Sequence, residues 1–276
     1  MNPQAIGIIG LGIIGSRIAS HLAKTGRHVF VWSRSARAVP NFLASPGEVA
    51  AAAGIIELFV RDDAALLEAV EDMLPVLTAE HVVINHATVS PAATYEAAKR
   101  VAQAGAAFLD CPFTGSKLAA QNAKLVYYVG GDSAVLERVR PVLEASSSKI
   151  MHVGEIGHAT ILKIATNLLT AVSVKGLSEA LALTKAHGVE PQQLLATLEP
   201  NANFSPLVAF KLPAMIQGDF EPHFSLQNML KDADFALDLA KEKAVSVPAL
   251  GVMAEAMRDA MKAGHAEKDF SIISAN

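Results

Sequence analysis

The N-terminal segment constrains the fold more than any other part of the sequence. Gly10, Gly12 and Gly15 form the pattern G-x-G-x-x-G. A short apolar run, residues 6–9, precedes these glycines, apolar residues at helical spacing follow them, and a second apolar run spans residues 29–32. This order predicts a strand, a tight turn, a helix and a second strand, which is the context in which such glycines bind a dinucleotide.

Each glycine of the pattern has an expected physical role. Gly10 permits the sharp turn, Gly12 allows the backbone to approach a pyrophosphate, and Gly15 lets the helix lie close to the strand. The helix start, with the backbone of Ile13 and Ile14, presents free N–H groups and the positive end of the helix dipole to phosphates. We therefore predict that these residues bind the cofactor. The alternative is a glycine turn with a structural role only.

The end of the second predicted strand indicates which dinucleotide binds. An NAD site usually has an acidic residue there, which accepts hydrogen bonds from the ribose 2′-hydroxyl. Residues 32–37 contain no Asp or Glu; instead Arg34 is flanked by Ser33 and Ser35. A guanidinium can bind a 2′-phosphate in bidentate fashion, so we predict NADP as cofactor. The alternative is that Arg34 and Arg37 belong to a solvated loop and that either cofactor is accepted.

Composition excludes several other classes of protein. The chain has 276 residues, enough for two domains, and a net charge of −4, which disfavours a nucleic-acid partner. One cysteine, Cys111, allows no internal disulfide and favours a reducing compartment, so a cytoplasmic location without a leader is expected. The longest charge-free apolar stretch of the later helix, residues 164–174, is too short to cross a membrane. The histidines show no metal-ligand spacing, so no metal and no membrane partner are predicted.

Alternation of strands and helices in the first half predicts a doubly wound, mostly parallel Rossmann sheet. The expected strands are 6–9, 29–32, 55–60, 82–85, 107–110, 125–129 and 150–153, and the expected helices between them include 64–73, 94–103 and 132–143. A long apolar helix then follows over residues 157–187, and only helices are expected after it: 192–198, 207–216, 225–243 and 250–263. We predict an α/β chain with an NADP-binding domain at residues 1–155 and an all-helical domain for substrate binding and dimerisation at residues 156–276, joined by the long helix.

The long helix also contains the best catalytic candidates. Lys163 and Asn167 are four residues apart and therefore lie on one face of the helix. The surrounding residues are apolar, and a lysine in such a run is costly unless it faces a polar cavity. Spacing alone leaves open a lysine that covers apolar surface with its stem. Because a helix this apolar needs cover, we also expect a second subunit, in a homodimer or homotetramer.

Five separate segments of the sequence resemble the β-hydroxyacid dehydrogenase family, and most closely its glyoxylate/succinic semialdehyde reductase group. The resemblance extends over nearly the whole chain. The segments are the glycine pattern, the turn HATVSP at 86–91, the stretch DCPFTGSK at 110–117, the helix start GHATILKIATN at 157–167 and the stretch FSLQNMLKD at 224–232.

The resemblance implies a role for each matched residue. Thr114 and Gly115 would hold the carboxylate of a small carbonyl substrate through a hydroxyl and backbone N–H groups. Lys163 would donate a proton to the developing alkoxide, and Asn167 would orient the substrate or the lysine. A reduced carbonyl needs a proton donor at its oxygen and an anion site for its acid group, so these roles agree with the chemistry.

The resemblance assigns three further residues to the cofactor side of the site. Thr88 would touch the cofactor from the turn, and Lys231 would lie beside the nicotinamide ribose. Asp232 would position the neighbouring helix.

Several residues depart from the family pattern. His86 replaces the usual Ser of the turn, Thr114 replaces a Ser, and Cys111 and Phe113 replace smaller residues. The segment 121–123 stands where the family often has a glycine, and Ser33 and Ser35 replace the usual residues around Arg34. For His86 both a structural role and a contact to cofactor or substrate are open, whereas Cys111 is expected to be a buried small apolar residue.

The sequence therefore predicts an NADPH-dependent reductase that converts a small aldehyde or keto acid, such as glyoxylate or succinic semialdehyde, to the hydroxy acid. One alternative is a 3-hydroxyisobutyrate-type dehydrogenase that works oxidatively. Another is an imine reductase, which the presence of Lys163 disfavours. A third is a catalytically inactive NADP-binding regulator.

Overall fold

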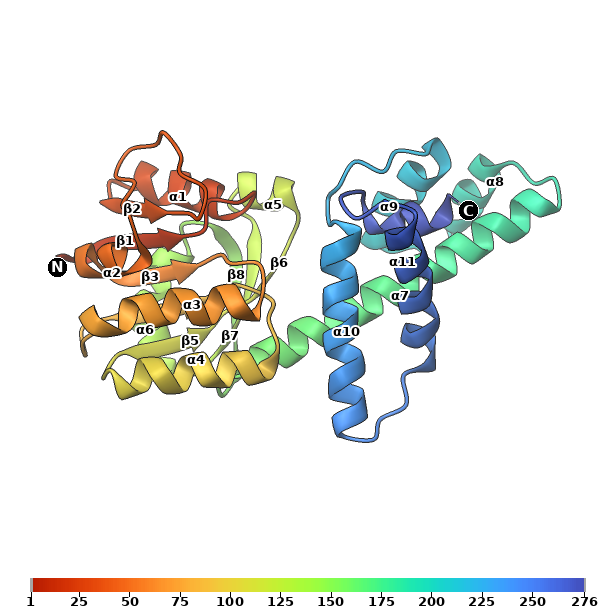
Figure 1. Cartoon of the computed structure of the whole chain (residues 1–276). Coiled ribbons are helices and arrows are strands. Elements are labelled where there is room, and N and C mark those ends of the chain that lie inside the picture. Colours follow the sequence, from red (N-terminus) through yellow and green to blue (C-terminus); the bar gives the residue numbers. More distant parts are fainter. Residues whose placement is uncertain (1, 276) are drawn as a thin grey trace. The chain divides into compact units, whose positions relative to one another are not determined.

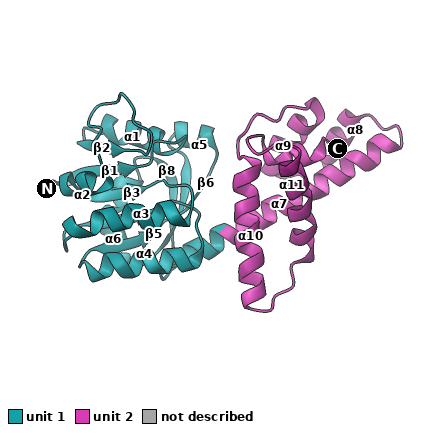
Figure 2. Cartoon of the chain, in the orientation of Figure 1, with its two compact units in different colours: residues 1–163 teal, residues 164–276 magenta. Residues whose placement is uncertain are grey.

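The structure is a computed structural model that describes residues 2–275 (Figure 1). The chain divides into two compact units, residues 1–163 (unit 1) and residues 164–276 (unit 2), coloured separately in Figure 2. The division falls inside the long helix, whereas the predicted domain boundary precedes it. Each unit has its own apolar core.

Unit 1 is built on one mostly parallel sheet in the order β2-β1-β3-β4-β5-β7-β6, with β8 paired to β7. The strands are β1 (Asn2–Ile9), β2 (Val29–Trp32), β3 (Ala53–Leu58), β4 (Val82–Asn85), β5 (Ala107–Asp110), β6 (Phe113–Thr114), β7 (Leu125–Gly130) and β8 (Ser147–Gly154). The first five strands in this order pair in parallel, whereas β7 runs antiparallel to β5 and β6. This confirms the predicted doubly wound sheet.

Helices cover both faces of this sheet (Figure 1). One apolar cluster packs α1 (Gly15–Lys24), α5 (Lys117–Gln121) and α6 (Ser133–Leu143) against the sheet. The cluster on the other face includes α2 (Pro46–Ala52), α3 (Asp63–Met73) and α4 (Pro91–Gln103), and the short helix η1 (Leu74–Val76) follows α3. Local sequence sets several helix starts, because the side chains of Asp62, Ser90 and Asp132 accept hydrogen bonds from the first backbone amides of α3, α4 and α6.

Among the described residues of unit 2 the regular elements are helices, and one isolated β-bridge joins Ser225 and Asp269. Unit 2 contains most of α7 (His158–Ala186), then α8 (Pro191–Leu198), α9 (Pro206–Gln217), α10 (Leu226–Glu242), α11 (Pro248–Lys262) and the short helix η2 (Phe270–Ser274). Its core gathers leucines, methionines and alanines from these helices. Gly188 follows α7 with φ +74°, in agreement with its predicted role at the helix C-terminus.

The sequence-based prediction missed four short elements of unit 1: α2, β6, α5 and the short helix η1. Helix α2 begins with Ser45 as its cap and Pro46 in its first turn, a start signal that was present but not used. Strand β6 has two residues and helix α5 has five, which is too short for a periodic pattern to be visible. Strand β3 also ends at Leu58, before the predicted end at residue 60.

The charge-free stretch of α7, residues 164–174, was predicted to be too short to cross a membrane, but this does not extend to the whole helix. Over its full length it is long and apolar enough to cross a membrane by length and composition, a criterion that core helices of proteins without any membrane span also meet. Charged side chains interrupt the apolar surface, among them Lys163, Lys175 and Glu179. Lys175 and Glu179 are one turn apart and form an ion pair with an Nζ–Oε1 distance of 3.5 Å.

Candidate active site

The glycine turn after β1 has the geometry of a phosphate-binding loop. Gly10 has φ +105°, and a Cβ there would lie 2.2 Å from the carbonyl oxygen of Phe59. A Cβ on Gly15 would lie 2.0 Å from the carbonyl oxygen of Gly10, so the helix start contacts the turn directly. A Cβ on Gly12 would meet nothing within 4 Å, so packing within the protein does not explain this glycine. An open approach to the backbone, followed by a helix N-terminus, fits a dinucleotide pyrophosphate.

The loop after β2 presents the residues that choose between the two cofactors. Arg34 and Ser35 are exposed directly after the strand, and Ser33 is half-buried. The Ser33 hydroxyl donates to the backbone carbonyl of Ser35 at 2.6 Å, which gives the loop a tight turn. An exposed guanidinium with no acidic neighbour in this turn can donate hydrogen bonds to a 2′-phosphate.

The turn after β4 is held in place from both of its ends. Asn85 accepts a hydrogen bond from the backbone N–H of Ala87 at 3.1 Å. At the other end, Ser90 donates through its backbone N–H and its hydroxyl to the Asp63 carboxylate at 2.9 and 2.6 Å. Thr88 lies between these anchors and is half-buried. The sheet therefore presents Thr88 on a rigid turn that follows the carboxyl end of a strand, where ligands of doubly wound sheets bind.

His86, in the same turn, does not reach solvent. Its residue exposure is 1%, and its ring stacks on Phe59 with ring centres 4.6 Å apart. Of the two roles that the sequence left open, the structure supports the structural one. Cys111 is also fully buried, as predicted, and burial raises the pKa of its thiol well above the ordinary value.

The segment after β5 contains Thr114 and Gly115, the residues predicted to bind the substrate carboxylate. Thr114 is half-buried in the two-residue strand β6, opposite Val126. Gly115 follows with φ +132°, and a Cβ there would lie 2.9 Å from the Leu125 side chain. The glycine is therefore required by the backbone itself, while its exposed N–H group and the Thr114 hydroxyl remain suitable donors for a carboxylate.

Asp110 anchors the helix on which Lys163 lies, a role that sequence reasoning did not assign. Its carboxylate accepts hydrogen bonds from the backbone N–H groups of Gly157 and Thr160 at 3.1 and 2.9 Å, and from the Thr160 hydroxyl at 2.7 Å. These donors belong to the first turn of α7, whose N–H groups have no partner within the helix. Lys163 is half-buried three residues after Thr160, on the same side of the helix.

In unit 2, three of the predicted residues form one polar chain. Asn167 is 7% exposed and donates through Nδ2 to the Asp232 carboxylate at 2.6 Å. The other carboxylate oxygen of Asp232 lies 2.9 Å from Nζ of Lys231. The Lys231 ammonium also lies 4.9 Å from the ring centre of Phe235. Asp232 thus positions two predicted site residues from different helices, a more specific role than the one predicted for it.

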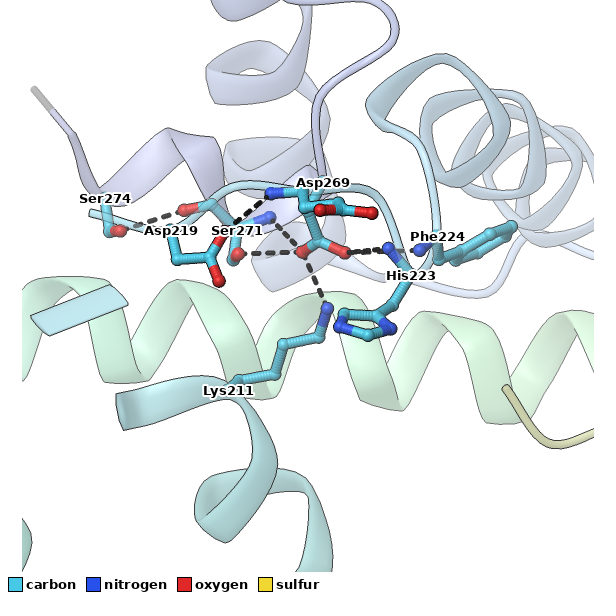
Figure 3. Close-up of polar contacts among 8 residues, drawn as sticks. Lys211, Asp219, His223, Phe224, Asp269, Ser271 and Ser274 are labelled. Carbon is cyan, nitrogen blue, oxygen red and sulfur yellow. Dashed lines mark hydrogen bonds and ion pairs between the residues drawn. The ribbon is translucent and has the colours of Figure 1, made fainter. Parts of the chain in front are cut away.

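A second polar cluster in unit 2 was not predicted (Figure 3). Lys211 of α9 donates to the Asp269 carboxylate at 2.6 Å, and both side chains are buried. Asp269 also accepts hydrogen bonds from Ser271 and from the backbone N–H groups of His223 and Phe224. Through these bonds Asp269 connects the C-terminal segment to α9 and to the loop before α10.

Most of the predicted site residues of unit 1 lie in segments that follow strands, and two of those in unit 2 share one partner. In unit 1 the glycine turn, the Thr88 turn and the Thr114 segment follow the carboxyl ends of β1, β4 and β5. In unit 2, Asn167 and Lys231 share Asp232 as their partner. Among residues 2–275, no group of three His, Cys, Asp or Glu side chains could hold a metal ion. Asp110 is the first residue of the matched segment 110–117, so the sequence contained a signal for it. Only the fold shows which hydrogen-bond donors its carboxylate contacts.

A doubly wound domain with this glycine turn, followed by a long helix with a lysine near its start and then by a helical unit, defines a class of nicotinamide-dinucleotide oxidoreductases. Residues 5–154 match the NAD-binding domain of 6-phosphogluconate dehydrogenase, and residues 157–275 match the NAD-binding domain of NADP-dependent 3-hydroxyisobutyrate dehydrogenase. The chain belongs to the β-hydroxyacid dehydrogenase family, and it is an NAD(P)-dependent oxidoreductase that acts on CH–OH groups.

Curated relatives of the chain act on different hydroxy or oxo acids. Glyoxylate/succinic semialdehyde reductase 2 of Arabidopsis thaliana is 26% identical over 98% of this chain and 78% of its own length. The 2-(hydroxymethyl)glutarate dehydrogenase of Eubacterium barkeri is 29% identical over 97% of this chain and 93% of its own length. At this distance the family and its reaction are shared, while substrates differ among its members.

Solved structures agree with this assignment. The 3-hydroxyisobutyrate dehydrogenase of Mycobacterium tuberculosis, solved with L-serine, has a TM-score of 0.90 and 26% identity, and covers 99% of this chain and 98% of its own. An imine reductase of Myxococcus stipitatus, solved with NADP+, has a TM-score of 0.67 at 23% identity, over 98% of this chain and 99% of its own, and shares the fold.

Proposed function

We propose that the enzyme is an NADPH-dependent reductase of small aldehyde or keto acids, of the glyoxylate or succinic semialdehyde kind. The observation that supports this most directly is the pair Lys163 and Asn167 on one face of α7, with Asn167 bonded to the buried Asp232. A proton donor and an oriented amide on one helix face are what the reduction of a carbonyl requires. The segment with Thr114 and Gly115 supplies donors for the acid group of such a substrate.

The proposed mechanism assigns one task to each group. The glycine turn and Lys231 hold the cofactor, which supplies a hydride to the carbonyl carbon when it is bound. The Thr114 hydroxyl and the Gly115 backbone N–H bind the substrate carboxylate. The Lys163 ammonium donates its proton to the carbonyl oxygen as the hydride arrives, so the product is the neutral alcohol, and solvent protonates the amine again. Asn167, held by Asp232, orients the substrate oxygen towards this proton.

The test of the mechanism is the variant Lys163→Met, which keeps the bulk of the side chain and removes its charge. Loss of a positioned acid typically costs about 10²–10⁴-fold in rate. We expect the variant to fold, to bind NADPH and to turn over at least about a hundredfold more slowly on its best oxo-acid. Lys175→Met, on the same helix, is the matched control and should retain activity. Near-normal turnover of Lys163→Met would contradict the mechanism.

The preference for NADPH rests on Arg34 and the absence of an acidic residue after β2. Charge-assisted hydrogen bonds contribute roughly 1.5–3 kcal/mol. Arg34→Ala should therefore raise the KM for NADPH at least about tenfold and leave the KM for NADH nearly unchanged. Arg37→Ala, in the same exposed loop, is the control. An equal loss for both cofactors in Arg34→Ala would show that Arg34 only shapes the loop.

An oxidative 3-hydroxyisobutyrate-type activity is the second candidate, and the match to the dehydrogenase solved with L-serine favours it. The same groups serve both directions, because Lys163 can accept the proton that it otherwise donates. Rates measured with NADPH across a panel of oxo-acids, and with NADP+ across the matching hydroxy acids, separate the two. No oxidation or reduction of these acids with either cofactor would leave two alternatives, an imine reductase and a catalytically inactive dinucleotide-binding protein.

We also propose that a second copy of the chain covers the exposed apolar side chains of α7, in a homodimer or homotetramer. Ile161, Leu162, Leu169 and Leu183 are each at least 39% exposed. Such residues along one helix need apolar cover, from protein or from lipid. Light scattering of the protein without detergent measures the oligomeric state. A monomer under these conditions, or a protein recovered only with membranes, would contradict the proposal.

A further inference from the structure

Unit 1 contains a buried acid that the proposed mechanism does not use. Glu57 lies in β3, in register with Ile8 of β1 and Ile84 of β4, and its residue exposure is 1%. Its Oε2 atom lies 3.7 Å from Nε2 of His86, which is buried to the same degree. Within the described part of the chain, neither of these two atoms has a hydrogen-bond partner. Two polar atoms left in this state are costly, and a shortening of at least about 0.5 Å would bring them to hydrogen-bond distance.

The other nitrogen of the His86 ring determines which atom holds the proton. Nδ1 lies 2.7 Å from the backbone carbonyl of Cys111. A carbonyl only accepts hydrogen bonds, so Nδ1 must be the protonated nitrogen. In a neutral ring Nε2 then has a lone pair, and only a donor can face it favourably. Glu57 can be that donor when its carboxyl group is protonated.

The electrostatic surroundings favour this arrangement. Burial raises the pKa of Glu57 to about 8, although Arg27 lowers it in part. Burial lowers the pKa of His86 to about 3, although the hydrogen bond to the backbone carbonyl of Cys111 raises it in part. Both directions describe a neutral acid facing a neutral ring near pH 7.

The remaining titratable groups around the pair are two neutral side chains, one buried carboxyl group and one arginine. The Cys111 thiol and the Tyr127 hydroxyl both have pKa values raised well above their ordinary values by burial and by Glu57, so both are neutral. Asp110 acts on Cys111 and is itself buried. Arg27 is the cation that acts on Glu57, and its effect is smaller than that of burial.

The His86 side chain is linked to all three segments that the proposed function assigns to cofactor or substrate, to one of them through Phe59. Its own backbone belongs to the turn with Thr88. Nδ1 binds the Cys111 carbonyl, shortly before Thr114. The ring stacks on Phe59, whose carbonyl oxygen lies directly against Gly10 of the glycine turn.

Tyr127 closes the arrangement around the ring. Its ring centre lies 4.9 Å from that of His86, and the residue pairs with Phe113, the neighbour of Thr114. A rotation of the His86 ring would therefore disturb the positions of all three segments at once.

We propose that Glu57 and His86 share one buried proton, held on Glu57 and directed at Nε2, and that this pair positions the glycine turn, the Thr88 turn and the Thr114 segment for cofactor binding. This proposal rests on the proposed function, which assigns these three segments to cofactor and substrate. His86 is a positioning residue that does not touch the cofactor. When the shared proton is lost, a buried carboxylate faces a lone pair, so the three segments lose their common support above about pH 8.

The first experiment tests the pair without cofactor or substrate, through the ¹⁵N side-chain resonances of histidine. His86 is assigned by the signals that are missing in His86→Phe. We expect Nδ1 to be protonated and Nε2 to accept a hydrogen bond at pH 7. Glu57→Gln keeps a donor and should leave the Nε2 resonance near its wild-type position, whereas Glu57→Met should shift it. An Nε2-protonated ring, or equal spectra for the two variants, would overturn the shared proton.

The second experiment measures the dissociation constant of NADPH by fluorescence between pH 6 and pH 9.5. In the wild type, binding should weaken about tenfold as the pH rises through 8, which corresponds to one lost hydrogen bond. Glu57→Gln should bind like the wild type at pH 7 and lose this pH dependence. Glu57→Met should bind weakly at every pH. His81→Gln alters another buried histidine, which binds the carbonyl of Ala50, and should keep the wild-type profile.

The outcomes separate the two proposals. The same pH profile in wild type and Glu57→Gln would overturn the positioning role, even if the enzyme reduces oxo-acids as proposed. A wild-type protein that binds no NADPH would contradict the proposed function, while the histidine spectra would still decide whether the proton is shared.

Discussion

Each unit contains one buried pair of an acid and a base, and the two pairs differ in protonation. In unit 2, Lys211 and Asp269 lie 2.6 Å apart as an ion pair. In unit 1, Glu57 and His86 lie 3.7 Å apart, and their pKa directions describe two neutral groups. Residue exposures range from 1 to 5%, so the extent of burial does not explain the difference.

The difference follows from the donors that surround each carboxylate. Burial by itself would raise the pKa of Asp269, but Lys211 and the donors of Ser271 outweigh this effect and lower it. Backbone N–H groups of His223 and Phe224 occupy its second oxygen. For Glu57 burial dominates, because its Oε2 meets no such donor among residues 2–275. A buried carboxylate is therefore ionised only where the fold supplies enough donors.

The largest expected effect is on the ion pair of unit 2. Asp269→Leu leaves the Lys211 ammonium buried without its partner, which should cost about 3–5 kcal/mol of unfolding free energy. Urea unfolding followed by circular dichroism measures the loss. The double variant Lys211→Met/Asp269→Leu is the control, and it should recover most of the stability because no charge remains buried. A loss below about 1 kcal/mol in the single variant would place Asp269 among weak surface pairs.

A smaller effect of opposite sign is expected from Glu57→Gln. The folded-state pKa of Glu57 is raised from 4.5 to about 8, so its contribution to stability is present below pH 4.5 and is lost as the pH rises to 8. Relative to the wild type, the Gln variant should therefore gain about 3 kcal/mol between pH 4.5 and pH 7, at about 1.4 kcal/mol per pH unit. Urea unfolding at several pH values measures the difference. A constant difference would mean that Glu57 is ionised in the folded protein.

The pH dependence of stability that comes from Asp269 should have the opposite sign to that from Glu57, and the same urea measurements test it. Its folded-state pKa is lowered, so its contribution is present above the ordinary value of 3.8 and is lost as the pH falls below it. Asp269→Asn should therefore remove stability at pH 7 and change nothing further above pH 5. A pH dependence of the stability difference between Asp269→Asn and the wild type between pH 5 and 8 would contradict this sign.

The smallest expected effect tests how well the unit 2 cluster tolerates the loss of one donor. The Ser271 hydroxyl donates to Asp269 at 2.7 Å. Ser271→Ala should cost about 1 kcal/mol, because the remaining donors keep the carboxylate ionised. Ser274→Ala, which removes a hydroxyl that binds only the Ser271 carbonyl, is the control and should cost less. A cost near that of Asp269→Leu would show that Ser271 alone maintains the pair.

Much of the fold could be predicted because its signals are local. The glycine pattern and the alternation of apolar runs predicted the doubly wound sheet. The segments with Thr88, Thr114 and Lys163 were located by resemblance over short stretches. Short elements such as α5 and β6 were missed, because a few residues contain no period to detect.

The sequence by itself determined which segments follow which strands, since backbone preference and apolar periodicity act over neighbouring residues. Only the tertiary structure decided what the polar side chains of those segments meet. Asp110 caps α7 and His86 faces Glu57, through contacts between residues far apart in the chain. The protonation of such groups depends on burial and on nearby donors, and both exist only once the chain has folded.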